Sequence, residues 1–401
     1  MIDGLGADYF AKYRHRLPYL NAIAERGMLV ERLSPEKCGT SLPGRTSMIT
    51  GVSSAVHGIF GNVIWDGLKD GNQSKIGFRN ANYDDIKTST IAEQATQAGR
   101  KVANLGFGML NPEHSELYYP PAWTHEMLQS KDEKNPSEAD QNWLNQEKLA
   151  NQATWLQDLI SKDYPDKLVA RNYEHPNEYL LSGQMNDQIM ADWTAGLAIS
   201  RNDIDFIITE FAMPDYYLHR YGCEHDLTRF AIETADAQVG RVITALEKAN
   251  KLNDYNIMVT SDHGFTDIEY SIHPEHILSN DFGTPQFSCE GGILHLHYDN
   301  AEQLKVYTDQ LAEHDVVSFN NDYLPESQRN HIATFLAPEN CDFYLDKHHC
   351  RQAIGPSNYK ANHGFKAGHS ADERFLVMAG PDIQSGIVNR AEAEQVAPTM
   401  A

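Results

Sequence analysis

The sequence predicts an α/β fold built on a mostly parallel, doubly wound sheet. Apolar, strand-like runs alternate with amphipathic helical stretches, a pattern typical of parallel sheets covered by helices. The chain has 401 residues, of which 41% are hydrophobic, so it can bury a sizeable core. We expect that core to comprise residues 1–109, 181–265 and 361–401, with residues 110–180 and 266–360 inserted into it.

In the first part of the chain the expected elements follow one another at short intervals. Apolar residues at helical spacing predict helices, and short runs of Val, Ile and Leu predict strands. Gly27 and Gly51 end two of the helices, because glycine commonly follows a helix C-terminus. The expected elements are a helix over residues 8–28, a strand over 29–33, a short helix over 46–50, a helix over 88–99 and a strand over 101–107.

The two insertions differ in composition. The first is rich in Glu, Asn, Gln, Lys and Trp, and we expect it to be mostly helical, either shaping access to the sheet edge or acting as a solvated spacer. In the second, strand-like and helical patterns follow one another, so we expect a small α+β cap subdomain. Expected later elements are helices over 186–199, 227–249 and 301–313, and strands over 206–210, 255–260, 291–298, 341–346 and 375–379.

Charge and cysteine content exclude some classes of protein. The formal net charge is −23, whereas a protein that binds a nucleic-acid duplex needs clustered Lys and Arg. The five cysteines lack CxxC spacing, so neither a disulfide framework nor a thiolate zinc site is predicted, although Cys341 and Cys350 are candidates to pair. No apolar run approaches the ~20 residues of a membrane span, and no signal peptide is visible.

Both ends of the chain resemble interrupted elements. Residues 1–6 read as the end of a buried strand and the turn after it, and residues 396–401 read as the start of a helix. We therefore expect a fragment of a longer open reading frame. The sequence leaves the compartment open between a bacterial-type cytoplasm and periplasm, and it leaves the oligomeric state open.

A hydroxyl-rich loop precedes the short helix over residues 46–50. Ser41 lies in this loop shortly before the helix, where outward-pointing backbone N–H groups can meet a phosphate or sulfate. Ser41 is therefore a candidate nucleophile, although Thr40 or Ser41 alone would also serve as a helix cap.

Carboxylates and imidazoles recur beside strand-like runs. In open α/β sheets the carboxyl ends of strands form the ligand crevice, so such side chains converge from distant parts of the chain. Oxygen and imidazole ligands without thiolate suit Zn²⁺, with Mn²⁺ as an alternative, and six such ligands are enough for two ions. The six are Asp3, Asp215, His219, Asp262, His263 and His369.

These motifs together resemble the alkaline phosphatase superfamily, and within it the type I phosphodiesterase / nucleotide pyrophosphatase family. The segment from Ser41 to Gly51, Pro214-Asp215 with His219, and Ser261-Asp-His-Gly264 are similar to the family's nucleophile and ligand segments. The resemblance implies a three-layer α/β/α sandwich with inserted cap segments. It also implies a two-metal hydrolase of phosphoric esters or anhydrides, acting on a small molecule such as a nucleotide through a phosphoseryl intermediate.

The resemblance assigns each ligand to one of two ions. One ion is held by Asp215, His219 and His369, and the other by Asp3, Ser41, Asp262 and His263. Asn62 matches a position that hydrogen-bonds a phosphoryl oxygen. His363-Gly364 also partly matches the family's last motif; we favour His369, which lies closer in sequence to the final strand and follows a glycine.

Other members of the superfamily remain as alternatives. The pattern Ser41-x-Pro-x-Arg45 is close to the sulfatase signature, in which the first residue matures to formylglycine, and the family's usual nucleophile is Thr. Asp3-Gly4 provides one early carboxylate where sulfatases typically present two, which favours the two-metal hydrolase. Phosphonate hydrolases, including phosphonoacetate hydrolase, share the constellation, as do metal-dependent phosphomutases, and a catalytically inactive binding protein is the alternative from another class.

Overall fold

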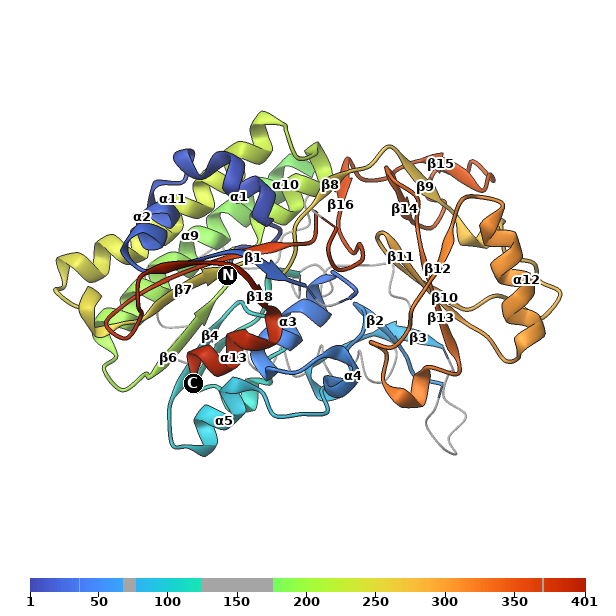
Figure 1. Cartoon of the computed structure of the whole chain (residues 1–401). Coiled ribbons are helices and arrows are strands. Elements are labelled where there is room, and N and C mark those ends of the chain that lie inside the picture. Colours follow the sequence, from blue (N-terminus) through green and yellow to red (C-terminus); the bar gives the residue numbers. More distant parts are fainter. Residues whose placement is uncertain (36, 68–76, 124–175, 370) are drawn as a thin grey trace.

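The computed structural model describes residues 1–35, 37–67, 77–123, 176–369 and 371–401, and Figure 1 shows their arrangement. Central strands lie between two groups of helices. In the view of Figure 1, α2 (Pro18–Arg26), α9 (Pro176–Ser200) and α11 (Asp226–Lys248) lie above the strands. The helices α3 (Ser41–Thr50), α5 (Ile91–Gln97) and α13 (Val396–Met400) lie below them.

Two groups of hydrogen-bonded strands meet at the first three residues of the chain. Ile2 N donates to Thr260 O at 2.9 Å, and Asp3 N donates to Phe211 O at 3.0 Å, so residues 1–3 lie between the two groups. One group has the order β18-β1-β17-β7 and the other the order β5-β4-β6. The strands are β1 (Met28–Ser34), β4 (Val102–Leu105), β5 (Leu117–Tyr119), β6 (Phe206–Thr209), β7 (Ile257–Thr260), β17 (Arg374–Ala379) and β18 (Gly386–Glu392).

The central strands are mixed in direction, so the expectation of a mostly parallel sheet is only partly met. β4 is parallel to both of its neighbours, and β1 is parallel to β18. β17 runs antiparallel to β1 and to β7, with Leu376 opposite Thr260. Because it is antiparallel, β17 begins near the edge at which β7 ends, so residues just before β17 lie on the same edge as residues just after β7.

Both faces of this sheet are buried. Leu29 and Val377 belong to the core under α2, α9 and α11. Their neighbours Val30 and Leu376 pack on the other side with Met48 of α3. Alternation of side chains along a strand sends successive residues to opposite faces, so two cores form on one sheet and the α/β class is confirmed.

Two expected helices have different bounds in the structure. The helix expected over residues 8–28 is divided into α1 (Ala7–Tyr13), a 3₁₀ turn at Arg14–Arg16 and α2, because Pro18 is tolerated only in a first helical turn. The helix α3 begins at Ser41 rather than at residue 46. Pro43 is its third residue, and Gly51 ends it with φ of 73°.

The cap segment, residues 266–360, contains two further sheets and one helix. Helix α12 packs through Tyr307 and Leu311 against Leu294 and Phe335 of the four-stranded sheet. That sheet has the order β10-β11-β13-β12, and a second has the order β14-β9-β15. The elements are β9 (Tyr270–Ile272), β10 (Phe287–Glu290), β11 (Ile293–His297), α12 (Ala301–Ala312), β12 (Val317–Phe319), β13 (Ile332–Leu336), β14 (Cys341–Phe343) and β15 (Ile354–Pro356).

The remaining short elements are α4 (Ser54–His57), β2 (Val63–Trp65), β3 (Phe78–Asn80), α10 (Met213–Tyr221), β8 (Thr266–Asp267) and β16 (Ala361–Asn362). β8 and β16 pair with each other where the chain enters and leaves the cap segment. Most of the insertion expected over 110–180 lies outside the described residues. Across all the described parts of the chain, no helix has both the length and the apolar composition needed to cross a membrane.

Candidate active site

Ser41 is the first residue of α3. At this end of a helix the backbone N–H groups have no hydrogen-bond partner within the helix. Its Oγ lies 3.1 Å from Nε2 of His263. Leu42 N donates to Oδ1 of Asn62 at 2.9 Å, so the Asn62 amide lies against the start of the helix. The structure therefore places the candidate nucleophile and Asn62 together, on a helix end rather than in a loop.

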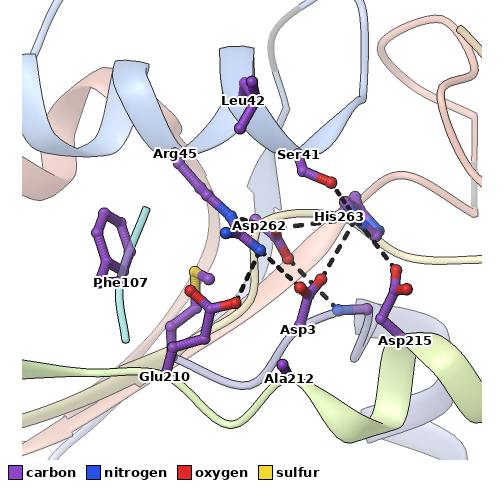
Figure 2. Close-up of polar contacts among 12 residues, drawn as sticks. Asp3, Ser41, Leu42, Arg45, Phe107, Glu210, Ala212, Asp215, Asp262 and His263 are labelled. Carbon is purple, nitrogen blue, oxygen red and sulfur yellow. Dashed lines mark hydrogen bonds and ion pairs between the residues drawn. The ribbon is translucent and has the colours of Figure 1, made fainter. Parts of the chain in front are cut away.

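The first ligand group comprises Asp3, Asp262 and His263, whose ligand atoms lie within 4.8 Å of one another. Nε2 of His263 is 3.4 Å from Oδ1 of Asp3 and 3.7 Å from Oδ2 of Asp262. Asp262 and His263 lie one and two residues beyond Ser261, which follows β7, and Asp3 follows Ile2, which hydrogen-bonds the end of β7. The expectation that strand ends bring these side chains together is met (Figure 2).

The second ligand group comprises Asp215, His263 and His363, again with ligand atoms within 4.8 Å of one another. Oδ1 of Asp215 lies 3.7 Å from Nε2 of His263 and 3.8 Å from Nε2 of His363. His219, one turn further along α10, places Nε2 3.6 Å from Oδ2 of Asp215. The rings of His263 and His363 stack with centroids 3.6 Å apart, so the two groups adjoin at His263.

His369 does not belong to either ligand group. Its ring stacks on Phe365, and its Nδ1 accepts a hydrogen bond from Ala371 N at 3.2 Å. His363 takes the expected place of His369, because β16 pairs with β8 just beyond β7 and so carries the following residue to His263. Sequence distance from the final strand favoured His369, whereas the structure places His363, and not His369, beside His263.

The short helix α10 is held by a carboxylate from another helix. Asp187 of α9 accepts hydrogen bonds from Ala212 N and Met213 N, both at 3.0 Å, at the N-terminal end of α10. This satisfies N–H groups that a helix start leaves without partners. Asp187 therefore fixes the element that carries Asp215 and His219.

Arg45 and Glu210 lie at the centre of the site, although neither was among the candidate site residues. Arg45 is fully buried and donates from Nη2 to Oδ2 of Asp3 at 2.6 Å and from Nε to Oδ2 of Asp262 at 2.8 Å. Nη2 also lies 3.0 Å from Oε1 of Glu210 (Figure 2). The guanidinium is 4.4 Å from the ring centroid of Trp123. Two sequence signals could have identified these residues. Arg45 lies one helical turn after Ser41, and Glu210 directly follows the strand β6.

Hydrogen bonds orient two of the imidazoles for metal binding. Nδ1 of His219 donates to Ala361 O at 3.1 Å, and Nδ1 of His263 donates to Gly264 O at 3.2 Å. A backbone partner at Nδ1 leaves the lone pair of Nε2 available to a ligand. Burial lowers the pKa of His219 to about 3 and that of His263 to about 4, which favours the neutral form that binds metals.

The pKa values of the two carboxylates in the first ligand group are shifted in opposite directions. Burial and the charge of Asp262 raise the pKa of Asp3 well above its usual value. Burial also acts to raise the pKa of Asp262, but His263 and Arg45 outweigh it and hold that pKa below its usual range. Oδ1 of Asp3 is buried and has no hydrogen-bond partner among the described residues. A cation beside Asp3 would satisfy this oxygen, so the donor set fits divalent metal ions.

Comparisons with known proteins give a family and a set of relatives. The family model described as "Type I phosphodiesterase / nucleotide pyrophosphatase" matches residues 1–380. The mouse protein "Bis(5'-adenosyl)-triphosphatase enpp4" is 23% identical over 263 residues, which cover 65% of this chain and 45% of the mouse protein. Human "Ectonucleotide pyrophosphatase/phosphodiesterase family member 7" is 29% identical over 101 residues, covering 25% of this chain and 20% of that protein. The chain thus spans less than half the length of these curated relatives.

Among solved structures, human ectonucleotide pyrophosphatase / phosphodiesterase 5 is similar to the whole chain. The match has a TM-score of 0.65 at 15% identity and covers 100% of this chain and 92% of that one. The murine counterpart, solved as an inactive variant in complex with AMP, has the same TM-score and identity. At this identity the likeness establishes a shared fold.

Proposed function

The chain belongs to the type I phosphodiesterase / nucleotide pyrophosphatase family, and on that premise we propose that it hydrolyses phosphoric ester or phosphoanhydride bonds. One observation carries the proposal. The hydroxyl of Ser41, at the N-terminus of α3, lies 3.1 Å from His263, the residue at which the two ligand groups adjoin. A nucleophile, an anion-binding helix end and two sets of metal-type ligands therefore share one place.

Two divalent ions, most suitably Zn²⁺ with Mn²⁺ as the alternative, fit this donor set. Asp3, Ser41, Asp262 and His263 would hold one ion. Asp215, His219 and His363 would hold the other, with His363 in place of His369. When bound, two such ions promote ionisation of the nucleophile and stabilise charge on the leaving oxygen.

The residues of the chain then have distinct tasks. Ser41 Oγ attacks phosphorus in line, the P–O bond to the leaving group breaks, and a phosphoseryl intermediate forms that water hydrolyses. Asn62, held by the Leu42 N–H, donates from Nδ2 to a non-bridging oxygen. The N-terminus of α3 favours the negative charge of the phosphoryl group. Arg45 contacts Asp3 and Asp262 and acts by keeping these carboxylates in place.

We propose a nucleotide-type phosphodiester or pyrophosphate as the substrate. The names of the relatives support this class, since one is a bis(5'-adenosyl)-triphosphatase and another was solved with AMP. The competing sulfatase reading requires conversion of Ser41 to formylglycine, which lowers the intact mass by two hydrogens. A phosphonoacetate hydrolase would retain Ser41 unmodified, so cleavage of phosphonoacetate, rather than intact mass, distinguishes it.

The test is hydrolysis by the metal-reconstituted protein of a panel containing an aryl phosphodiester, dinucleotide polyphosphates, phosphomonoesters, phosphonoacetate and an aryl sulfate. We expect cleavage of diesters and pyrophosphates, and a loss of roughly 10³-fold or more in kcat for Ser41→Ala. Ser47→Ala is the matched control, because Ser47 lies on the same helix but hydrogen-bonds His57. Retained diesterase activity in Ser41→Ala with metals bound would refute the nucleophile. Absence of bound zinc or manganese would favour an inactive binding protein.

A further inference from the structure

A third group of ligand-type side chains lies in the cap segment and shares no residue with the catalytic groups. It comprises His273, Asp346 and Cys350, whose ligand atoms lie within 4.8 Å of one another. His273 directly follows β9, and the other two lie in the turn after β14. β9 and β14 are neighbours in one small sheet, at the upper right in Figure 1.

His273 provides a buried nitrogen for which the described residues offer no hydrogen-bond partner. The residue is fully buried, and its Nδ1 donates to Tyr344 O at 2.8 Å, which leaves the lone pair on Nε2. Nε2 is buried without a hydrogen-bond partner among the described residues. A buried imidazole nitrogen of this kind costs free energy unless it finds a proton donor or a metal ion.

Gly355 keeps the space between the imidazole and the thiol open. A Cβ atom at this position would lie 2.8 Å from Nε2 of His273 and 3.1 Å from Sγ of Cys350. Both distances are too short for ordinary packing, so a side chain at residue 355 would push the two ligand atoms aside. Gly355 on β15 thus leaves room for Nε2 of His273 and Sγ of Cys350 to face the same point.

Asp346 is fixed by the turn that carries Cys350. Its Oδ1 accepts a hydrogen bond from Cys350 N at 3.0 Å and lies 3.4 Å from Cys350 Sγ. Its Oδ2 accepts hydrogen bonds from Arg351 N at 2.8 Å and from His276 Nε2 at 2.9 Å. Hydrogen bonds from outer groups to a ligating carboxylate are the usual support of a metal site.

We propose that His273 Nε2, Asp346 and Cys350 Sγ bind a zinc-type divalent ion in the cap segment. Imidazole nitrogen with thiolate sulfur favours zinc-like ions over Mg²⁺ and Ca²⁺, which prefer oxygen ligands. Binding converts the Cys350 thiol to a thiolate, with one proton released to solvent as the metal–sulfur bond forms. The ion would link the turn at residues 346–351 to the residue after β9, which is a structural role.

The test uses cobalt(II) as the probe on metal-depleted protein. A cobalt ion bound by a thiolate gives a thiolate-to-metal charge-transfer absorption, and neither catalytic ligand group contains a cysteine. We expect this absorption in the unmodified chain and in Asp262→Asn, and its loss in Cys350→Ser and in His273→Gln. Cys341→Ser is the matched control, because Cys341 lies on β14 of the same small sheet but outside the group, and it should keep the absorption.

A second measurement needs no substitution, so it does not depend on the folding of variants. All five cysteines are free, and Cys223 and Cys350 are partly exposed, so alkylation of the native protein followed by peptide mass analysis reports on these two. Zinc should protect Cys350 selectively and leave Cys223 as reactive as before. Absence of the thiolate absorption in the unmodified chain, or zinc-independent alkylation of Cys350, would overturn the proposal. An absorption that persists in Cys350→Ser would do so as well.

Discussion

The candidate active site and the cap group of His273, Asp346 and Cys350 assemble similar side chains in different ways. In the candidate active site Asp3 and Asp262 lie near strand ends and share the buried cation Arg45. In the cap group, backbone N–H donors of a turn hold Asp346, and the imidazole and thiol approach each other beside a glycine. The first arrangement concentrates charge and requires an internal counterion. The second is less charged and depends on the shape of one turn.

Replacing the buried cation should have the largest effect on stability. Arg45→Met leaves the carboxylates of Asp3, Asp262 and Glu210 without their shared partner, and we expect a loss of about 3–5 kcal/mol in the free energy of unfolding of metal-depleted protein. Denaturant titration measures it. The loss should shrink when zinc is added, because cations then neutralise Asp3 and Asp262. An equal loss with and without zinc would contradict the view that Arg45 serves these ligands.

The choice between the two histidines gives the next largest effect. His363→Ala removes an imidazole from the second ligand group, so we expect one metal ion fewer per chain and a fall in kcat of roughly 10²–10³-fold, or about 3–4 kcal/mol. Metal analysis and steady-state kinetics measure the two quantities. His369→Ala is the matched control and should keep both ions. The reverse outcome would restore His369 as the ligand.

A smaller effect concerns acid stability in the two regions. Burial lowers the pKa of His57, which bonds to α3, and that of His295 on β11 of the cap segment, each to about 3. The folded-state pKa lies below the ordinary value of about 6.5, so the unfolded chain binds more protons and stability falls as the pH drops from about 6.5 toward 3. Between pH 6.5 and pH 5 each should contribute a loss of about 2 kcal/mol.

Denaturant titrations of His57→Gln and His295→Gln at the two pH values measure these contributions. Each substitution should reduce the pH dependence of the free energy of unfolding by a similar amount. If only one of them did so, the two regions would differ in how their histidines are exposed on unfolding.

Strand ends explain what the sequence could predict. Apolar runs followed by Asp or His led to Asp3, Asp262 and His263, because a strand delivers the residue after it to the sheet edge whatever the sequence separation. His363 was ranked below His369. Its position depends on the pairing of β16 with β8, two strands of two residues each, which are too short to leave a periodic pattern. The antiparallel direction of β17 could not be predicted either, since a pattern of apolar residues does not reveal in which direction a strand runs in its sheet.

Arg45 and the cap group show a different limit. An arginine in a first helical turn is usually at the surface, and only the convergence of three carboxylates around it makes its burial favourable. Cys350 gave no metal signal because its partners lie 4 and 77 residues away, with no recurring spacing. Such groups form only when the chain folds. A sequence pattern can identify them only where the ligands are separated by a turn of fixed length, so that their spacing recurs.

Glu290, the last residue of β10, limits how freely the cap segment can be exchanged. Its carboxylate accepts hydrogen bonds from Asn62 N at 2.7 Å and Val63 N at 3.1 Å, and Asn62 in turn accepts from the first turn of α3. A chimera that grafts a different cap onto this core therefore replaces part of the support of Asn62 and, through it, of the helix start that carries Ser41. For protein engineering, a transplanted cap would have to bring an equivalent carboxylate to this position.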